Sequence, residues 1–422
     1  MVMLGIGSRG AYVELLQLGL FRSGYLDNID GIFGPKTEAA LRNFQKDFGL
    51  STTGRTDDAT WRYIYNYIRG YVMYTIRQGD TFWSLAQRYG TSARAISTAN
   101  PNVAPAGLQV GQTIVLPFGY RVVPSNISYT YILTSLVTDG LAKRYPFIRK
   151  GQIGTSVMGN QLINMIMGTG DRKVLINASH HANEWITTPL VLTFLESYAM
   201  AYSRADRIGG EEAVDLFEGA TLHMVPLVNP DGVDLVNGVV TGTFFDEAQR
   251  IANNYPSIPF PSGWKANIVG IDTNLSYPAL WEDARRIKFE QGFTSPAPRD
   301  YVGPSVLSAQ ESRAMYDYTN REVFDLTISY HTQGAVIFYK FLDKVPPRGL
   351  EIAQEFARVS GYDISDVPYE SSFAGYKDWV IQDYNVPSYT IEAGRGINPL
   401  PLSQFFDIYA DNLGIMTQAL VY

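Results

Sequence analysis

Apolar residues recur at helical spacing in two runs of the first 70 positions, and turn-forming residues separate the runs. A spacing of three and four residues places such side chains on one face of a helix. The inward positions are Val13, Leu16 and Leu20 in the first run and Leu41 and Phe44 in the second. Residues 30–35, which include two glycines and a proline, form the turn between them. This pattern predicts a compact helical domain over residues 1–70.

Residues 71–118 change to a pattern of strand, two short helices and strand. Apolar and β-branched residues at 74–76 and 114–117 predict the outer strands. The turn sequence Gly79-Asp80-Thr81 and the short apolar groups after it predict two brief helices between them. Residues 118–126, which contain glycine and proline, then predict a linker.

From residue 127 to residue 422, β-rich apolar runs alternate with amphipathic stretches. The strand candidates are residues 174–176, 221–228, 326–330 and 388–391. Residues 184–205 place apolar side chains at helical spacing, as expected of a helix that covers a sheet. This pattern predicts an α/β domain with a mixed sheet covered by helices. The chain as a whole is therefore expected to be multidomain, with a small all-α domain, a βααβ domain and this larger α/β domain.

Composition narrows the chemistry that these domains can use. The 422 residues contain no cysteine, which excludes disulfides and thiolate metal sites, so any zinc must be held by His and carboxylate side chains. The net charge of -7 argues against a nucleic-acid partner, because phosphate binding needs concentrated Lys and Arg. No run approaches the roughly 20 apolar residues of a membrane span. Residues 1–10 also lack the basic and apolar segments of an export signal.

Two of the four histidines follow predicted strands. His181 comes after the first strand candidate and is trailed by Glu184, whereas His331 directly follows the third. Glu392 stands in the same relation to the fourth. Because sites in open α/β sheets form beyond the carboxyl ends of strands, we expect these four side chains to converge. The remaining histidines, His180 and His223, are expected to be structural.

Two His and one carboxylate are a known ligand set for catalytic zinc, which keeps a coordination position for water. His181, Glu184 and His331 supply that set, so the sequence predicts one Zn²⁺ per chain. Glu392 is a second carboxylate that is not needed as a ligand, and it suits proton transfer from water to a leaving amine. The alternative is that His181 and Glu184 only cap the helix that follows them.

The two amino-terminal segments carry motifs of wall-binding modules. Residues 1–70 resemble the peptidoglycan-binding domain of wall hydrolases through Gly31, Gly34, Lys36-Thr37, Ala40-Leu41, Phe44-Gln45 and Thr53-Gly54. Residues 71–118 resemble a LysM module through Tyr74-Thr75-Ile76, Gly79-Asp80-Thr81, Leu85-Ala86, Asn100-Pro101 and Val110-Gly111-Gln112. The resemblance implies that both modules bind peptidoglycan, the LysM module through its N-acetylglucosamine-containing glycan. The alternative for the first segment is a generic three-helix adaptor.

Residues 127–422 resemble the zinc carboxypeptidase family, which includes bacterial wall endopeptidases. The matching motifs are His181-Ala182-Asn183-Glu184-Trp185, Asn229-Pro230-Asp231-Gly232, Asp272-Thr273-Asn274, Ser329-Tyr330-His331 and Thr390-Ile391-Glu392. The resemblance implies that the first and fourth motifs hold zinc, that the second is a structural turn and that Asn274 contacts substrate. It also implies that Glu392 is the catalytic carboxylate.

Two departures from the family pattern concern charge in the substrate site. Carboxypeptidases carry an Arg directly after the loop Asn that pairs with the terminal carboxylate of the substrate, but this chain has Leu275 after Asn274. The expected oxyanion Arg is replaced by Lys265, which can also stabilise developing negative charge. Removal of a carboxy-terminal residue through the usual ion pair is therefore not expected.

Two further residues are assigned to substrate binding. The resemblance implies a mobile Tyr that contacts substrate, and Tyr369 is the first candidate with Tyr376 as the alternative. Arg395 lies three residues beyond Glu392 and is expected either to face substrate carboxylates or to form a surface salt bridge.

These features together resemble the bacterial γ-D-glutamyl-diamino acid endopeptidases. The resemblance implies a zinc metallopeptidase that cleaves between D-Glu and meso-diaminopimelate or Lys in peptidoglycan stem peptides, with wall glycan and stem peptides as partners. A metallocarboxypeptidase and a catalytically dead wall-binding adaptor are the alternatives. The missing export signal predicts a cytoplasmic location, as in a sporulating mother cell, or wall association by another route.

Overall fold

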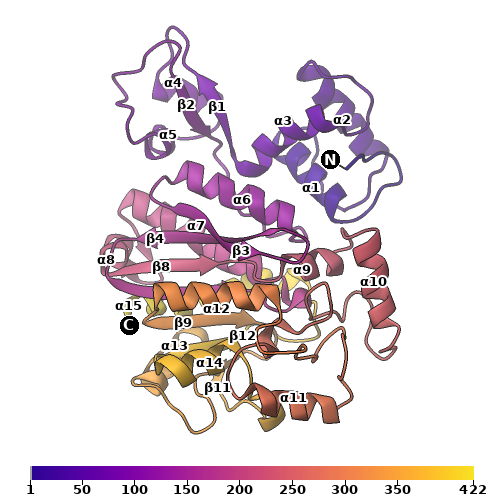
Figure 1. The fold of residues 1–422 in the computed structure, drawn as a ribbon. Helices are drawn as coiled ribbons and strands as arrows, with labels where there is room; N and C mark the ends of the chain where they lie inside the picture. The colour runs from indigo at the N-terminus through magenta and orange to yellow at the C-terminus, as the bar shows by residue number, and fades with distance from the viewer. Residues whose placement is uncertain (1) are drawn as a thin grey trace. The chain divides into compact units, whose positions relative to one another are not determined.

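The computed structural model describes residues 2–422, which fall into two compact units (Figure 1). The amino-terminal unit comprises the chain up to Ser128 together with Ile132–Arg149, and the second unit comprises Tyr129–Tyr131 and Lys150–Tyr422. Helix α6 (Tyr131–Arg144) thus belongs mostly to the amino-terminal unit, although it follows residue 127.

Three helices form the first part of the amino-terminal unit: α1 (Ala11–Arg22), α2 (Pro35–Asp47) and α3 (Asp58–Arg69). The five apolar side chains expected to face inward are all fully buried. Pro35 is the first residue of α2, where its missing N–H is not needed. Asp57 caps α3 by accepting a hydrogen bond from the Thr60 N–H, and Gly70 ends the helix in the left-handed conformation. The predicted all-α fold is confirmed.

An antiparallel pair of strands and two short helices form the second part of this unit. The elements are β1 (Tyr71–Thr75), α4 (Phe82–Arg88), α5 (Ala93–Ala99) and β2 (Thr113–Pro117). Asn100 joins the second helix to the second strand, because its side-chain amide donates to the carbonyls of Ile96 and Val115 and accepts from the Val115 N–H. The predicted βααβ order is confirmed.

The segment 118–126, which the sequence predicts to be a linker, has no regular secondary structure but is packed. Val122 is fully buried. The guanidinium of Arg22, at the end of α1, donates to the carbonyls of Arg121 and Val122 at 2.9 Å each. The Tyr120 hydroxyl donates to the Tyr67 carbonyl at the end of α3. Glycine and proline content alone did not reveal these fixed contacts.

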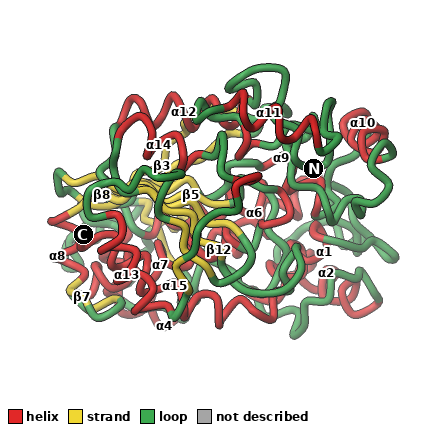
Figure 2. The backbone as a smooth tube through the Cα atoms, turned by 90° about the horizontal axis from the view of Figure 1, so that it is seen from below, coloured by secondary structure: helices red, strands yellow, loops and turns green. Residues whose placement is uncertain are grey.

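An eight-stranded mixed sheet forms the centre of the second unit (Figure 2). Its strand order is β11-β10-β12-β9-β5-β8-β4-β3. The strands are β3 (Arg149–Thr155), β4 (Gln161–Gly168), β5 (Arg172–Ala178), β8 (Ala220–Val225), β9 (Leu326–His331), β10 (Val336–Phe338), β11 (Asp363–Ile364) and β12 (Ser388–Glu392). A separate pair joins β6 (Arg207–Ile208) to β7 (Glu211–Glu212).

The four strands foreseen in this sheet are β5, β8, β9 and β12, and they form its parallel centre. Strands β3, β4, β10 and β11 were not foreseen. The β8 strand ends at Val225 instead of residue 228, because Pro226 has no N–H to continue the ladder. The register pairs His331 with Glu392 across β9 and β12. The carboxyl ends of the parallel strands therefore meet at one edge.

Helices cover both faces of the sheet, with α12 and α14 on one face and α7, α13 and α15 on the other (Figure 2). The helices of this unit are α7 (Thr187–Arg204), α8 (Ala213–Gly219), α9 (Pro230–Val236), α10 (Thr243–Ala252), α11 (Trp281–Glu290), α12 (Gln310–Glu322), α13 (Gly349–Ser360), α14 (Tyr376–Tyr384) and α15 (Phe405–Val421). Helix α7 confirms the covering helix expected after Glu184. Apolar residues of α12 and α14 pack with Leu175 of β5 in one buried cluster.

Candidate active site

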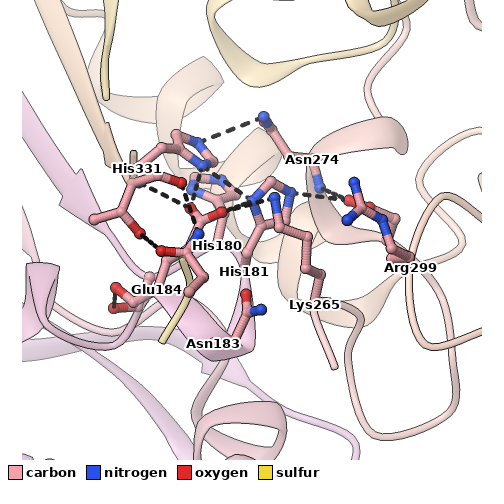
Figure 3. A network of polar contacts seen from close by, with 12 residues as sticks. His180, His181, Asn183, Glu184, Lys265, Asn274, Arg299 and His331 are labelled. Carbon is pink, nitrogen blue, oxygen red and sulfur yellow. Dashed lines mark hydrogen bonds and ion pairs between the residues drawn. The ribbon is translucent and has the colours of Figure 1, made fainter. Parts of the chain in front are cut away.

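Three potential metal ligands converge at the carboxyl edge of the sheet (Figure 3). His181 and Glu184 come from the segment after β5, and His331 is the last residue of β9. Glu184 Oε1 lies 2.9 Å from His181 Nδ1, and Glu184 Oε2 lies 2.9 Å from His331 Nδ1. The two Nδ1 atoms are 3.2 Å apart. Among residues 2–422, this is the one group of His and carboxylate side chains that matches a metal site.

These distances fit zinc. Ligands bound at 2.0–2.1 Å in tetrahedral geometry lie about 3.3 Å from one another. Burial raises the pKa of Glu184, but His181 and then Lys265 outweigh it and hold the pKa well below its usual range. Burial lowers the pKa of His331, which favours the neutral imidazole. Burial lowers the pKa of His181, but the Glu184 carboxylate outweighs it and raises the pKa to about 9. Ionised carboxylate and neutral imidazole are the forms that bind metal, so metal binding would displace the proton from the His181 ring.

The local backbone explains how His181 and Glu184 come to share one side. Ser179 turns the chain after β5 with a φ of 54°, and its hydroxyl lies 2.8 Å from the Thr188 hydroxyl in α7. A short 3-10 turn, η1 (Ala182–Glu184), follows directly. The Thr187 hydroxyl donates to the Glu184 carbonyl and so joins this turn to the start of α7. The alternative in which His181 and Glu184 serve as helix caps is not observed, because neither side chain caps η1 or α7.

Asp272 holds the other ring nitrogen of His181. Its Oδ1 lies 3.2 Å from His181 Nε2, while its Oδ2 accepts the Asp300 N–H. Burial raises the pKa of Asp272, but the His181 ring outweighs it and the net pKa is lowered. A carboxylate in this position fixes the tautomer and orientation of a metal-binding histidine. Asp272 belongs to the Asp272-Thr273-Asn274 motif, but its contact with His181 was not expected from the sequence.

Glu392 ends β12 beside His331 and lines the same pocket. Within the part of the chain that the structure describes, its carboxylate accepts no hydrogen bond. Burial, reinforced by the nearby Glu184 carboxylate, raises the pKa of Glu392 to about 8. A carboxyl group with a pKa near neutrality can both accept and return a proton at physiological pH.

Lys265 contributes the positive charge nearest to the ligands. Its Nζ lies 2.8 Å from Glu184 Oε1. Burial lowers the pKa of Lys265, but the Glu184 carboxylate outweighs it, so the net shift is upward and the side chain stays cationic. Figure 3 shows Arg299 beyond Lys265, on the side away from His331, and Arg299 also lines the pocket. Arg299 lies in a proline-flanked loop away from any strand end, so no pattern marked it beforehand.

Two asparagines hold the loop that carries Lys265 and Asn274. Asn229 donates to the carbonyls of His180 and Ala266, at 3.1 and 3.0 Å, which joins the ligand segment to this loop. Asn267 accepts the Ile271 N–H and donates to the buried Glu311 carboxylate. The Asn229–Gly232 motif therefore acts as a structural turn, as expected.

A pocket of about 790 Å³ opens over the ligands. Its lining includes two of the three potential ligands, His181 and His331, together with the polar residues Lys265, Asp272, Asn274 and Glu392. Leu275, where carboxypeptidases carry Arg, also lines it. Asn274 is oriented by the Tyr376 N–H, which donates to its Oδ1 at 3.0 Å.

Two predicted substrate residues stand outside the pocket lining. Tyr369 is 62% exposed beside lining residue Pro368, whereas its alternative Tyr376 is fully buried and its hydroxyl lies 2.8 Å from that of Thr319. Arg395 is exposed, and its guanidinium donates to the Gly334 carbonyl.

The two remaining histidines are buried. His180 Nε2 lies 3.0 Å from the Tyr277 hydroxyl, and His223 Nδ1 lies close to the Tyr318 hydroxyl. The His180 carbonyl also accepts a hydrogen bond from the Thr273 hydroxyl, so His180 joins the ligand segment to the loop that carries Asn274. His223 lies inside β8, as expected of a structural residue.

Family models match three parts of the chain. Residues 9–64 match a putative peptidoglycan binding domain, residues 74–117 a LysM domain, and residues 135–413 the zinc carboxypeptidase family. The first two matches confirm the modules expected from the sequence. When bound, zinc acts in this family site as a Lewis acid and activates water. Across residues 2–422, no helix has the length and apolarity needed to cross a membrane.

Two curated bacterial proteins are similar over much of their length. The γ-D-glutamyl-L-diamino acid endopeptidase 1 of Lysinibacillus sphaericus is 41% identical over 82% of this chain and 98% of its own. The uncharacterized protein YqgT of Bacillus subtilis is 39% identical over 66% of this chain and 73% of its own.

Solved carboxypeptidase structures share the fold at low sequence identity. Bovine thrombin-activatable fibrinolysis inhibitor, in complex with tick carboxypeptidase inhibitor, has a TM-score of 0.55 at 17% identity, covering 70% of this chain and 97% of its own. Carboxypeptidase A from Helicoverpa armigera has a TM-score of 0.51 at 18% identity, covering 92% and 88%. The family match spans more than half of the sequence and includes the convergent ligand set. The chain therefore belongs to the zinc carboxypeptidase family and is a metallopeptidase with amino-terminal peptidoglycan-binding and LysM modules.

Proposed function

We propose that this metallopeptidase hydrolyses the amide bond between D-Glu and the diamino acid in peptidoglycan stem peptides. The observation that carries the proposal is the 41% identity, across nearly the full length of the relative, to an enzyme named for γ-D-glutamyl-L-diamino acid cleavage. The peptidoglycan-binding and LysM modules support it, because they suit a wall polymer as substrate.

In the proposed site, His181, Glu184 and His331 hold the zinc ion. Glu392 takes the proton of the attacking water and passes it to the departing amine of the diamino acid. Its burial and raised pKa favour both halves of this transfer. Asn274 contacts and orients the substrate, and the Tyr376 N–H fixes the Asn274 side chain by donating a hydrogen bond to its Oδ1.

Lys265 stabilises the negative charge that develops on the carbonyl oxygen during attack. Its charge is retained despite burial, and buried donors act strongly on such charge because water does not screen them. The ion pair with Glu184 holds Lys265 on the side of the pocket where the metal ligands lie.

Leu275 favours internal cleavage over removal of a carboxy-terminal residue. An exopeptidase fixes the free carboxylate with a cation, and a charge-assisted hydrogen bond of this type contributes roughly 1.5–3 kcal/mol. Leu275 cannot make that bond. The α-carboxylate of D-Glu, which branches from the γ-linked backbone, is instead assigned to Lys265 and Arg299. Arg395, the earlier candidate, is less suited because it lies outside the pocket lining.

Both modules are proposed to keep the enzyme on peptidoglycan. Linked binding modules raise the local concentration of a catalytic domain at a polymer without changing its chemistry. The proposed setting is wall-associated, with a sporulating mother cell as one place where this enzyme meets peptidoglycan. Tyr369, exposed at the pocket edge, is proposed to contact the bound stem peptide.

The wild-type protein is expected to cleave L-Ala-γ-D-Glu-meso-diaminopimelate or its Lys counterpart and to release little Phe or Arg from hippuryl carboxypeptidase substrates. Mass spectrometry of the products with both substrate classes tests this. Efficient release of terminal Phe or Arg, while the γ-D-glutamyl peptides remain uncleaved, would contradict the proposal and show that the protein acts as a carboxypeptidase.

His331→Ala is expected to reduce bound zinc from one ion per chain to well below stoichiometry, because the other two ligands cannot complete the site. Metal analysis of purified protein measures this. His223→Gln is the matched control, since it changes a buried histidine inside β8. Stoichiometric zinc in folded His331→Ala would show that the ligand set is misassigned.

Glu392→Gln is expected to retain zinc but to lose at least about 100-fold in kcat on the γ-D-glutamyl peptide, because amide cannot accept the proton. Glu290→Gln, at an exposed position of α11, serves as the control and should keep wild-type kcat. Turnover and zinc content are measured on the same preparations. Wild-type turnover in zinc-loaded Glu392→Gln would show that another residue is the general base.

Soluble oligomers of N-acetylglucosamine are expected to slow cleavage of intact sacculi several-fold and to leave cleavage of small stem peptides unchanged. The reason is that they compete for the LysM module without entering the pocket. Release of amino groups from both substrates is followed at rising oligomer concentration. Equal inhibition of both reactions would mean that the oligomer acts at the active site.

A further inference from the structure

Three charged side chains are linked in a row along one wall of the pocket. Lys288 of α11, Arg299 and Asp300 all contribute to the pocket lining. Asp300 Oδ1 lies 2.7 Å from Lys288 Nζ, and Asp300 Oδ2 accepts a hydrogen bond from Arg299 Nε at 2.6 Å. One carboxylate therefore holds a cation on each of its two oxygens.

The backbone on both sides of Arg299 is fixed to the metal side of the pocket. The Pro298 carbonyl accepts the N–H groups of Lys265 and of the residue after it, at 2.7 and 2.9 Å. The Asp300 N–H donates to Asp272 Oδ2 at 3.1 Å, and Asp300 has a φ of 64°, an uncommon value outside glycine. The Arg299 side chain therefore starts from a set position beside Lys265.

The guanidinium of Arg299 has donors to spare. It carries five N–H groups, and Asp300 accepts from the one on Nε. Within the described residues, the two Nη groups donate to no other group, and the side chain is 44% exposed. Two N–H groups of a guanidinium match the two oxygens of a carboxylate. Lys265, by contrast, is already paired with Glu184.

Lys288 keeps this wall of the pocket positive. Arg299 and Asp300 alone would have no net charge, whereas the three side chains together carry one positive charge. The Lys288 side chain is only 8% exposed, and a buried charge is costly unless it is paired. Lys288 thus offsets the carboxylate that orients Arg299, so the guanidinium can attract an anion.

The glutamyl residue of the proposed substrate supplies such an anion. Its α-carboxylate is free, because the scissile amide is made through the γ-carboxyl group. A short methylene stem separates this carboxylate from the scissile carbonyl, whose oxygen is assigned to Lys265. A cation beside Lys265 is therefore in the region that the α-carboxylate reaches. In a stem whose α-carboxylate is amidated, a neutral carboxamide faces the guanidinium instead, and its NH₂ group repels the N–H donors.

We propose that Arg299 forms a bidentate ion pair with the free α-carboxylate, so that the enzyme selects stems with D-Glu over stems with D-isoglutamine, the α-amidated form. Asp300 orients the guanidinium, and Lys288 offsets the charge of Asp300. This inference rests on the proposed function and deepens it. Arg299 becomes a specificity-determining residue, Asp300 and Lys288 are positioning residues, and the catalytic roles stay unchanged.

The test compares two peptides with the full-length zinc enzyme. One is L-Ala-γ-D-Glu joined to the diamino acid that the wild type cleaves faster, and the other is the same peptide with the α-carboxylate amidated. Wild-type kcat/KM is expected to be roughly 10- to 100-fold higher for the first, the factor that one charge-assisted hydrogen bond provides. This comparison needs no variant, so it stands even if a substitution in the pocket wall fails to fold.

Arg299→Gln is expected to lower kcat/KM for the acid peptide to the level of the amidated one and to leave the amidated one nearly unchanged. Arg299→Lys should keep part of the preference, because an ammonium retains the charge without the fork. Arg250→Gln is the matched control, because it removes an exposed arginine of α10 that pairs with Glu247 outside the pocket lining. It should leave both values at the wild-type level.

Asp300→Asn tests the positioning role. A carboxamide has one oxygen and cannot accept from both Lys288 and Arg299, while asparagine tolerates the positive φ at this position. The variant is expected to keep its zinc and to lower the ratio of the two kcat/KM values several-fold. A merely structural role would lower both values by one factor and leave their ratio unchanged.

Equal wild-type kcat/KM for the two cleaved peptides would overturn the inference and leave the proposed function intact. Retention of the full preference in Arg299→Gln would also overturn it, and so would an equal fall for both peptides, since that is the result of a structural role. An unchanged ratio in Asp300→Asn would overturn the positioning role of Asp300. Failure of the wild type to cleave either peptide would instead contradict the proposed function.

Discussion

Parallel pairing of β5, β9 and β12 is the constraint on which the rest of the site depends. The register sets Glu392 opposite His331, and β5 runs beside β9 until the chain turns at Ser179. A slip of one residue in either pair would send the alternating side chains to the opposite face of the sheet. Apolar packing of α7 on one face of the sheet and α14 on the other maintains this register. The geometry of the metal site therefore depends on packing in the hydrophobic core.

Buried charges at this edge stabilise one another. Glu184 is surrounded by His181, His331 and Lys265, and Asp272 by His181 and the Asp300 N–H. An isolated carboxylate at such depth would take up a proton, as the raised pKa of Glu392 indicates. The pKa of Glu184 is lower than that of Glu392 because cationic groups surround Glu184. Two carboxylates at the same edge of the sheet can therefore serve different roles, Glu184 as a metal ligand and Glu392 as a proton carrier.

The sequence predicted the parts of this protein that rest on local patterns. Helical spacing located α1, α2 and α7, and strand-end position located His181, His331 and Glu392. It did not reveal Asp272 as the partner of His181 or Arg299 as a pocket residue, because both come from loops that meet the strand ends only through long-range folding. The short strands β10 and β11, with three and two residues, carry too little pattern to be detected, and their pairing is decided by neighbours.

The hydrogen bonds from Arg22 to the segment after β2 bear on how such proteins acquire their parts. Arg22 belongs to the helical domain, yet it holds backbone that follows the LysM module, and Val122 is buried there. Recombination that exchanged the helical domain alone would remove this guanidinium from the carbonyls that it binds. The two wall-binding modules and the nine residues after them are therefore expected to be inherited as one block, and shuffling between wall hydrolases should place its breakpoints outside that block.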